Sequence, residues 1–161
     1  MPQISICLWF DTEAQEAANH YVRIFQDMGR KASMRSVARY SAHEPGPVGT
    51  VMTATFRLDG QDFMALNGGP HFKHSPAMSI MVKCADQAEV DGFWDRLLVG
   101  GVPSQCGWLT DRFGVSWQIV PAALERLTSS DVPGQSARVM QALLGMVKLD
   151  IAALERAARE G

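Results

Sequence analysis

Several features that define large classes of proteins are missing from this 161-residue sequence. It contains no run of about 20 apolar residues, the length that a membrane-spanning helix needs. It contains no cluster of Lys and Arg, and its formal net charge is only -2. Nucleic acid is therefore not an expected partner, because contacts to phosphates need clustered basic residues. The sequence also starts without the basic residues and longer apolar stretch of a signal peptide, so no membrane partner is expected.

Cysteine is scarce, and its three positions are widely separated. Cys7, Cys84 and Cys106 include no C-x-x-C pair, so they predict neither a disulfide framework nor a secreted scaffold. A reducing, cytoplasmic location is the simplest expectation. Cys106 is the one thiol that we consider for ligand binding, since it immediately precedes Gly107 and Trp108. We favour a buried, inert thiol there, because no Cys-His-Asn or Cys-His-Asp order typical of thiol hydrolases is recognisable.

Apolar residues are plentiful, at 47% of the chain, and can form a hydrophobic core. The length is close to that of most single domains, so residues 1–161 are expected to form one domain.

The beginning of the chain predicts a strand, a helix and a second strand. Residues 4–10 are apolar on both faces, as in a strand buried on both sides. Thr12 and Gln15 have the spacing of a capping box, which predicts that a helix begins there. Gly29 is well placed to end this helix, and residues 32–40 suit a strand.

A hairpin follows a loop that is rich in Pro and Gly. Asp59-Gly60 lies between two alternating apolar segments, residues 50–58 and 61–66, and predicts a two-residue turn. The order of elements in residues 1–70 is therefore β-α-β-β-β.

The same order returns in residues 76–121. Asp86 and Glu89 repeat the helix cap, and Gly114 repeats the turn of the second hairpin. Aligning Gly60 with Gly114 places Phe63 opposite Trp117 and Met64 opposite Gln118. The expected strands are residues 78–84, 102–105, 107–112 and 115–120. We interpret residues 1–70 and 76–121 as two copies of one module.

Residues 122–161 change in character and predict a helical extension. Pro133 suits the first turn of a helix that runs to about Val147, and Asp150 suits the cap of another that runs through Ala158. Their apolar residues exceed one narrow stripe, so these helices should pack against the sheet or against a second subunit.

Six strings of this sequence match a known family: CLWFD from Cys7, ALNGGPHF from Ala65, QCGWL from Gln105, FGVSWQIVP from Phe113, VMQA from Val139 and DIAAL from Asp150. They resemble the PhnB-like proteins, also called 3-demethylubiquinone-9 3-methyltransferase-like proteins, of the glyoxalase or vicinal-oxygen-chelate superfamily. The resemblance extends over essentially the whole chain, including its tail. It implies an α+β, glyoxalase-like fold of two βαβββ modules plus C-terminal helices. It also implies a small-molecule cleft and a homodimer.

The resemblance also implies where a metal would be bound. Metal-dependent members of the superfamily place His, Gln or Glu at the start of each module's first strand and near the end of its last strand. Here the strand starts are Ile4-Ser5 and Met78-Ser79, and the last-strand positions are Met64 and Gln118. Catalytic metal sites need about three protein ligands. We therefore expect no metal and no cofactor.

The remaining candidates concern ligand binding. Gln118 lies in a mostly apolar strand, either as a buried amide bonded to backbone or as a group that orients a ligand. His71 and His74 lie in a Gly/Pro-rich loop, where solvent exposure or the rim of a pocket is favoured over metal binding. His71 is alternatively a polar contact or a general base. Trp108 is our choice for a pocket wall, although tryptophans in strands are ordinarily part of a core.

The leading hypothesis is a protein that binds a small apolar or aromatic molecule, with Gln118, Trp108, Asn67 and His71 near the ligand. A methyltransferase, as the family name suggests, is one alternative. Neither predicted strand-to-helix turn, however, carries the glycines of a nucleotide-binding turn. A metal-dependent lyase, isomerase or dioxygenase is a second alternative, and a dimeric, non-catalytic interaction module is a third.

Overall fold

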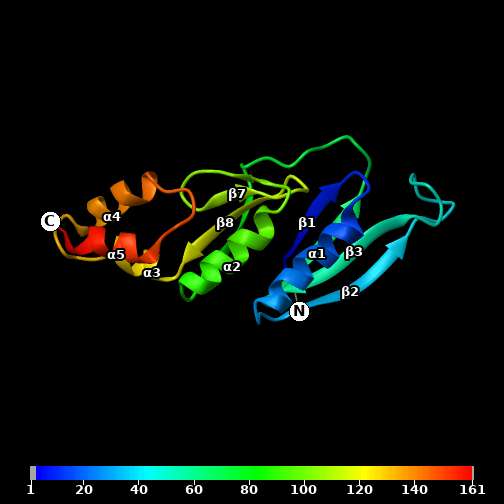
Figure 1. Cartoon of the computed structure of the whole chain (residues 1–161). Helices are drawn as coiled ribbons and strands as arrows, with labels where there is room; N and C mark the ends of the chain where they lie inside the picture. Colours follow the sequence, from blue (N-terminus) through cyan, green and yellow to red (C-terminus); the bar gives the residue numbers. More distant parts are fainter. Residues whose placement is uncertain (1–2, 161) are drawn as a thin grey trace. The chain divides into compact units, whose positions relative to one another are not determined.

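The computed structural model describes residues 3–160 of the chain. The chain divides into two compact units, Met1–His74 and Ser75–Gly161, and each contains one four-stranded sheet. Figure 1 colours the chain from blue at its N-terminus to red at its C-terminus and labels most of its helices and strands. No helix in the described range is long and apolar enough to cross a membrane. The expectation that the sequence starts without a signal peptide depends partly on Met1 and Pro2, which lie outside the described residues.

The first unit has the predicted β-α-β-β-β order, and its strands are arranged β1-β4-β3-β2. β1 runs parallel to β4, whereas β3 is antiparallel to both of its neighbours. The predicted two-residue turn is confirmed, because Asp59 and Gly60 have φ angles of 48° and 84°. The elements are β1 (Ser5–Phe10), α1 (Ala14–Asp27), β2 (Ala32–Arg39), β3 (Val51–Leu58) and β4 (Gln61–Asn67).

The second unit repeats this arrangement, with its strands in the order β5-β8-β7-β6. β5 pairs with β8 in parallel, and Ile80 lies opposite Trp117 as Ile6 lies opposite Phe63 in the first unit. The predicted equivalence of Phe63 and Trp117 is therefore confirmed. The elements are β5 (Ser79–Cys84), α2 (Gln87–Leu98), β6 (Val102–Pro103), β7 (Trp108–Thr110) and β8 (Ser116–Pro121). The α+β fold with two βαβββ modules is the glyoxalase-like fold that we expected.

Each sheet has a buried face, which packs against its helix, and a second face, which we call the far face. Successive side chains of a strand alternate between the two faces. In the first unit Phe56 and Phe63 stack with ring centroids 5.1 Å apart beneath α1. In the second unit Trp117 and Ile119 are fully buried on the helix side. Gln118 therefore lies on the far face, as the alternation predicted.

The capping box at Thr12 is wrong. Helix α1 begins at Ala14, and its N-cap residue Glu13 makes no side-chain capping bond. The amide of Ala14 donates instead to Oδ1 of Asn67, at 2.8 Å. A residue distant in sequence thus replaces the local cap. The predicted cap at Asp86 is confirmed, because its carboxylate accepts from the amide of Glu89 at 2.9 Å.

Helix α1 ends as expected. Gly29 has a φ angle of 74°, and its amide donates to the carbonyl of Gln26, while the amide of Arg30 donates to that of Phe25. These two bonds form a Schellman motif, in which glycine adopts the left-handed conformation.

Three helices form the C-terminal extension: α3 (Ala123–Thr128), α4 (Gln135–Leu144) and α5 (Ile151–Arg159). The predicted helix from Pro133 to Val147 is shorter at both ends. It stops at Leu144, since the carbonyls of Met146 and Val147 accept bonds from Cys106 and Gly107. The cap at Asp150 is confirmed by a 3.0 Å bond from the amide of Ala153. The helices share a buried cluster of Leu127, Val139, Leu143, Leu149, Leu154 and Ala158.

Candidate functional site

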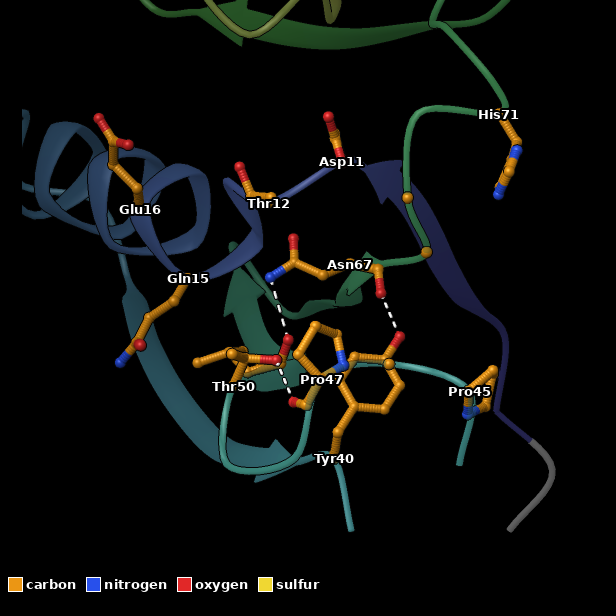
Figure 2. Close-up of a pocket in the computed structure, with 14 residues that line it drawn as sticks. Asp11, Thr12, Gln15, Glu16, Tyr40, Pro45, Pro47, Thr50, Asn67 and His71 are labelled. Carbon is orange, nitrogen blue, oxygen red and sulfur yellow. Dashed lines mark hydrogen bonds between the residues drawn. The ribbon is translucent and has the colours of Figure 1, made fainter. Parts of the chain in front are cut away.

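A pocket of about 680 Å³ lies in the first unit, where the ends of β1 and β4 meet the start of α1 and the loop between β2 and β3. We call it the rim pocket. Figure 2 shows its side chains arriving from all four of these segments. Its volume is within the usual range for sites that bind small molecules. It is lined by Asp11, Thr12, Gln15, Glu16, Tyr40, Pro45, Gly46, Pro47, Thr50, Val51, Asn67, Gly68, Gly69 and His71.

One wall of the rim pocket is the loop of residues 41–50, which folds back on Tyr40. A Cβ atom on Gly46 would lie only 2.3 Å from the Tyr40 ring, so glycine permits this close approach. The Tyr40 hydroxyl donates to the carbonyl of Asn67, which ties the loop to β4 (Figure 2). Within the loop, both the amide and the hydroxyl of Thr50 donate to the carbonyl of Pro47. The wall is therefore held by its own hydrogen bonds.

The opposite wall is the segment that follows β4. The indole of Trp9 lies against Gly68, where an added Cβ would come within 2.2 Å of the ring. Its Nε1 donates to the carbonyl of Gly69 at 2.9 Å, and Phe72 packs edge-on against the same indole. Trp9 therefore fixes the path of the backbone that leads to His71.

Asn67 lies at the base of the rim pocket, and its amide serves the fold. Oδ1 caps helix α1 at Ala14, and Nδ2 donates to the carbonyl of Val51 at 3.1 Å. An asparagine side chain has capacity for about four hydrogen bonds, so two of them are already used here. Asn67 thus has a clear structural role, and its contact with a ligand stays a prediction.

The charged groups of the rim pocket are mostly acidic. Asp11 and Glu16 contribute carboxylates, whereas no lysine or arginine lines the pocket. The Asp11 carboxylate makes no hydrogen bond or ion pair with any other residue in the range 3–160. His71, the one imidazole, is exposed at the edge, which is the rim position that the sequence favoured. A ligand that donates hydrogen bonds would suit these acceptors.

Gln118 and Trp108 lie together in the second unit. They are paired across β7 and β8, so both side chains project from the far face of that sheet. Nε2 of Gln118 donates to the hydroxyl of Ser79 at 2.8 Å. Both Gln118 and Trp108 are half-buried, and the amide oxygen of Gln118 accepts no side-chain or backbone bond within the described residues.

Cys106 occupies a different environment. It has a φ angle of 59°, and it packs against the shared core of the C-terminal helices. Its amide donates to the carbonyl of Met146 at 2.8 Å. A ligand contact at this thiol stays a prediction, and its surroundings are those of a structural cysteine.

The predicted site residues therefore fall into three groups. Asn67 and His71 line the rim pocket, Gln118 and Trp108 share the far face of the second sheet, and Cys106 faces the extension. Sequence reasoning missed Asp11, Glu16 and Tyr40. The only signal for Tyr40 was the loop with Pro45, Gly46 and Pro47, whose composition predicts a turn but not its partner.

The positions implied for a metal carry few suitable donors. In the first unit these positions are occupied by Ser5 and Met64, and in the second unit by Ser79 and Gln118. The Gln118 amide is turned so that its nitrogen meets Ser79. Residues 3–160 contain no group of three or more His, Cys, Asp and Glu residues arranged to hold a metal ion. These residues do not fit the superfamily's metal site.

Comparison with known proteins places the chain in a family. The model of the 3-demethylubiquinone-9 3-methyltransferase family matches residues 2–120. The chain belongs to this family. The PhnB protein from Bacillus cereus is 34% identical, with a TM-score of 0.66 over 75% of this chain and 100% of its own. A protein from Pseudomonas aeruginosa is 23% identical, with a TM-score of 0.59 over 75% of this chain and 98% of its own.

The family match ends at residue 120, although we expected the resemblance to include the tail. Residues 121–161, which hold α3, α4 and α5, therefore lie outside the family model. No curated protein matches the chain. The match to the family therefore covers the two modules and does not include the C-terminal extension.

Proposed function

We propose that this family member binds a small apolar or aromatic molecule in the rim pocket. The observation that carries this proposal is the pocket itself: about 680 Å³, walled by two segments that are fixed by their own hydrogen bonds. A pre-formed site loses little entropy when a ligand binds, which favours affinity.

The lining suggests how such a ligand would lie. The Tyr40 ring, Pro45 and Pro47 offer apolar surface for its body. Asp11 and His71 offer polar groups for its substituents, and the carboxylate accepts hydrogen bonds. A separate ligand contact at Gln118 and Trp108, within the second unit, is the second part of this proposal, because these two side chains share one face of that unit's sheet.

Binding is proposed to need no metal. The donor set at Ser5, Met64, Ser79 and Gln118 supports this part of the proposal, since a single amide oxygen is too few ligands. Elemental analysis of the purified protein is expected to give far less than one equivalent of any transition metal. One tightly bound equivalent would refute the metal-free site while leaving ligand binding in the rim pocket open to its own test.

S-adenosylmethionine is not the expected ligand, although the family name contains methyltransferase. The turn from β1 to α1 is Asp11-Thr12-Glu13 and holds no glycine, and both sheets mix parallel and antiparallel strands. Cofactor sites of the doubly wound type need a glycine-rich turn. Calorimetry is expected to show no binding, and micromolar affinity would overturn this view.

A further part of the proposal concerns the location, the oligomeric state and the partners of the chain. We infer a cytoplasmic homodimer that binds neither nucleic acid nor membrane. The near-neutral charge and the wide separation of the three cysteines in the sequence support this inference. Light scattering of the purified chain tests the dimer, and a monomer at micromolar concentration would contradict it.

A ligand screen tests the rim pocket directly. Aromatic fragments with hydrogen-bond donors are expected to raise the melting temperature of the full chain and to shift the amide signals of Tyr40 and Gly69 in NMR spectra. The His71→Ala variant should weaken the best fragment, whereas His43→Ala, a matched change outside the pocket lining, should not. Fragments that bind while both sets of signals stay unchanged would refute the location.

A further inference from the structure

A second hollow lies on the far face of the first sheet and differs in charge from the rim pocket. It has a volume of about 520 Å³. Arg35 comes from β2 and Arg57 from β3, and they face one carboxylate, Asp62 of β4. The lining is Gln3, Ser5, Arg35, Thr55, Phe56, Arg57, Asp62 and Phe63. Two guanidinium groups and one carboxylate give the hollow a surplus of one positive charge.

The guanidinium groups retain free donors. Arg57 binds Asp62 through Nε at 2.6 Å and Nη2 at 3.0 Å, which leaves its Nη1 group without an acceptor in the described range. The hydrogen bond from Arg57 lowers the pKa of Asp62, and the nearby charge of Arg35 lowers it further. Arg35 itself makes no side-chain hydrogen bond or ion pair with any residue between 3 and 160. Arginine without a partner suits a carboxylate or phosphate group.

The strand register shows what lies beside this charge. Ser5, Asp62 and Arg57 form one row across β1, β4 and β3. Two residues further along the strands, the next row on the same face holds Cys7, Met64 and Thr55, and the row after it holds Trp9, Leu66 and Thr53. The far face therefore passes from charged to apolar over a short distance.

The second module lacks this arrangement. The equivalent row is Ser79, Ser116 and Thr110, three uncharged hydroxyl residues. The repeated fold therefore forms without an ion pair at this row. Folding alone does not explain why the first module carries Arg57 and Asp62 there, with Arg35 beside them.

We infer that the far face of the first module binds a small organic anion, whose carboxylate or phosphate group pairs with Arg35 and the free edge of Arg57. Its apolar body lies along Met64 toward Leu66. The Arg57–Asp62 pair holds one guanidinium in place, and Arg35 supplies the charge that the ligand neutralises. Because this hollow and the rim pocket share no lining residue, the inference does not depend on the proposed function.

Benzoate, its neutral analogue benzamide and inorganic phosphate test the inference on the full chain. Benzoate is expected to bind saturably in the millimolar range or tighter, with shifts of the NMR amide signals of Ser5, Arg35 and Thr55. Benzamide should bind much more weakly, and added salt should weaken benzoate binding because Arg35 is exposed. Phosphate should compete with benzoate, since it offers the anionic group without the apolar body.

Variants separate the site from general charge. Arg35→Gln should weaken benzoate about tenfold or more, as expected for loss of a charge-assisted hydrogen bond. Arg23→Gln, an equal change of charge on the exposed side of α1, should leave affinity unchanged. The double variant Arg57→Gln with Asp62→Asn keeps an amide pair of similar shape and should also weaken binding. Equal affinity for benzoate and benzamide, an equal effect of Arg23→Gln, or no saturable binding of either anion would overturn the inference.

Discussion

Asn67 offers the sharpest test of the structural role that the rim pocket reveals. The Asn67→Ala change removes the cap of α1 at Ala14 and the bond to the carbonyl of Val51. Loss of a helix cap costs about 1 kcal/mol and loss of a neutral hydrogen bond about another 1 kcal/mol. The free energy of unfolding should therefore fall by about 2 kcal/mol, which lowers the melting temperature of a chain of this size by about 4–8 °C.

Asn67→Asp is the matched control. Its carboxylate still accepts from the amide of Ala14 and carries a charge that a helix N-terminus favours, but it no longer donates to Val51. The loss should be clearly smaller than for alanine. Urea unfolding followed by circular dichroism measures both variants. The reasoning is refuted if alanine costs less than about 0.5 kcal/mol, or if the two variants are equally destabilised.

Three further predictions concern the second unit. Gly107→Ala should cost about 1–2 kcal/mol for its φ angle of 84° and about 1–3 kcal/mol more for overpacking, because the new Cβ would lie 2.9 Å from the Ile119 carbonyl oxygen and 3.0 Å from Leu149. Gly114→Ala, with a φ of 88° and nothing within 4 Å, should show only the first loss in urea unfolding, and equal losses would contradict the packing argument. Hydrogen bonds from Gln87 and Lys148 lower the pKa of Asp91 in the folded chain. The contribution of the Asp91 carboxylate to folding stability is therefore complete above the pKa of the unfolded chain, and it is lost as the pH falls through the lower pKa of the folded chain. Asp91→Asn should therefore be less sensitive than the parent chain to acid below about pH 4, and parallel pH profiles would count against this. Deleting residues 132–161 should expose Leu127 and remove the carbonyls that accept from the amides of Cys106 and Gly107. The shortened chain should lose solubility, which light scattering measures, and a soluble monomer would show that the extension is dispensable.

Local signals predicted most of the architecture. Asp59-Gly60 identified the hairpin because both turn positions need positive φ angles, and Asp86 and Asp150 identified helix starts because their caps are local. The capping box predicted at Thr12 was wrong because the actual cap of α1 is not local in sequence. The donor at Ala14 is satisfied by Asn67, which is 53 residues away in sequence, and spacing rules do not detect such a partner.

The candidate site was less predictable than the fold. Alternation along β8 placed Gln118 on the far face, and a Gly/Pro-rich segment placed His71 on a loop. Tyr40 and Asp11, which are 29 positions apart in the sequence, both line the rim pocket, and the loop of residues 41–50 folds back on the Tyr40 ring at Gly46. Contacts of this kind depend on tertiary structure and leave no periodic pattern in the sequence.

The backbone bonds from Cys106 and Gly107 to Met146 and Val147 give the extension a role beyond packing. They place Met146 and Val147 beside the two residues that immediately precede β7, so a segment from outside the duplicated module satisfies the backbone at this end of the strand. This chain cut after residue 120 would have to satisfy the same two amides with water or with another chain. The extension thus shields two backbone donors of the second module that would otherwise be open to solvent or to a neighbouring chain.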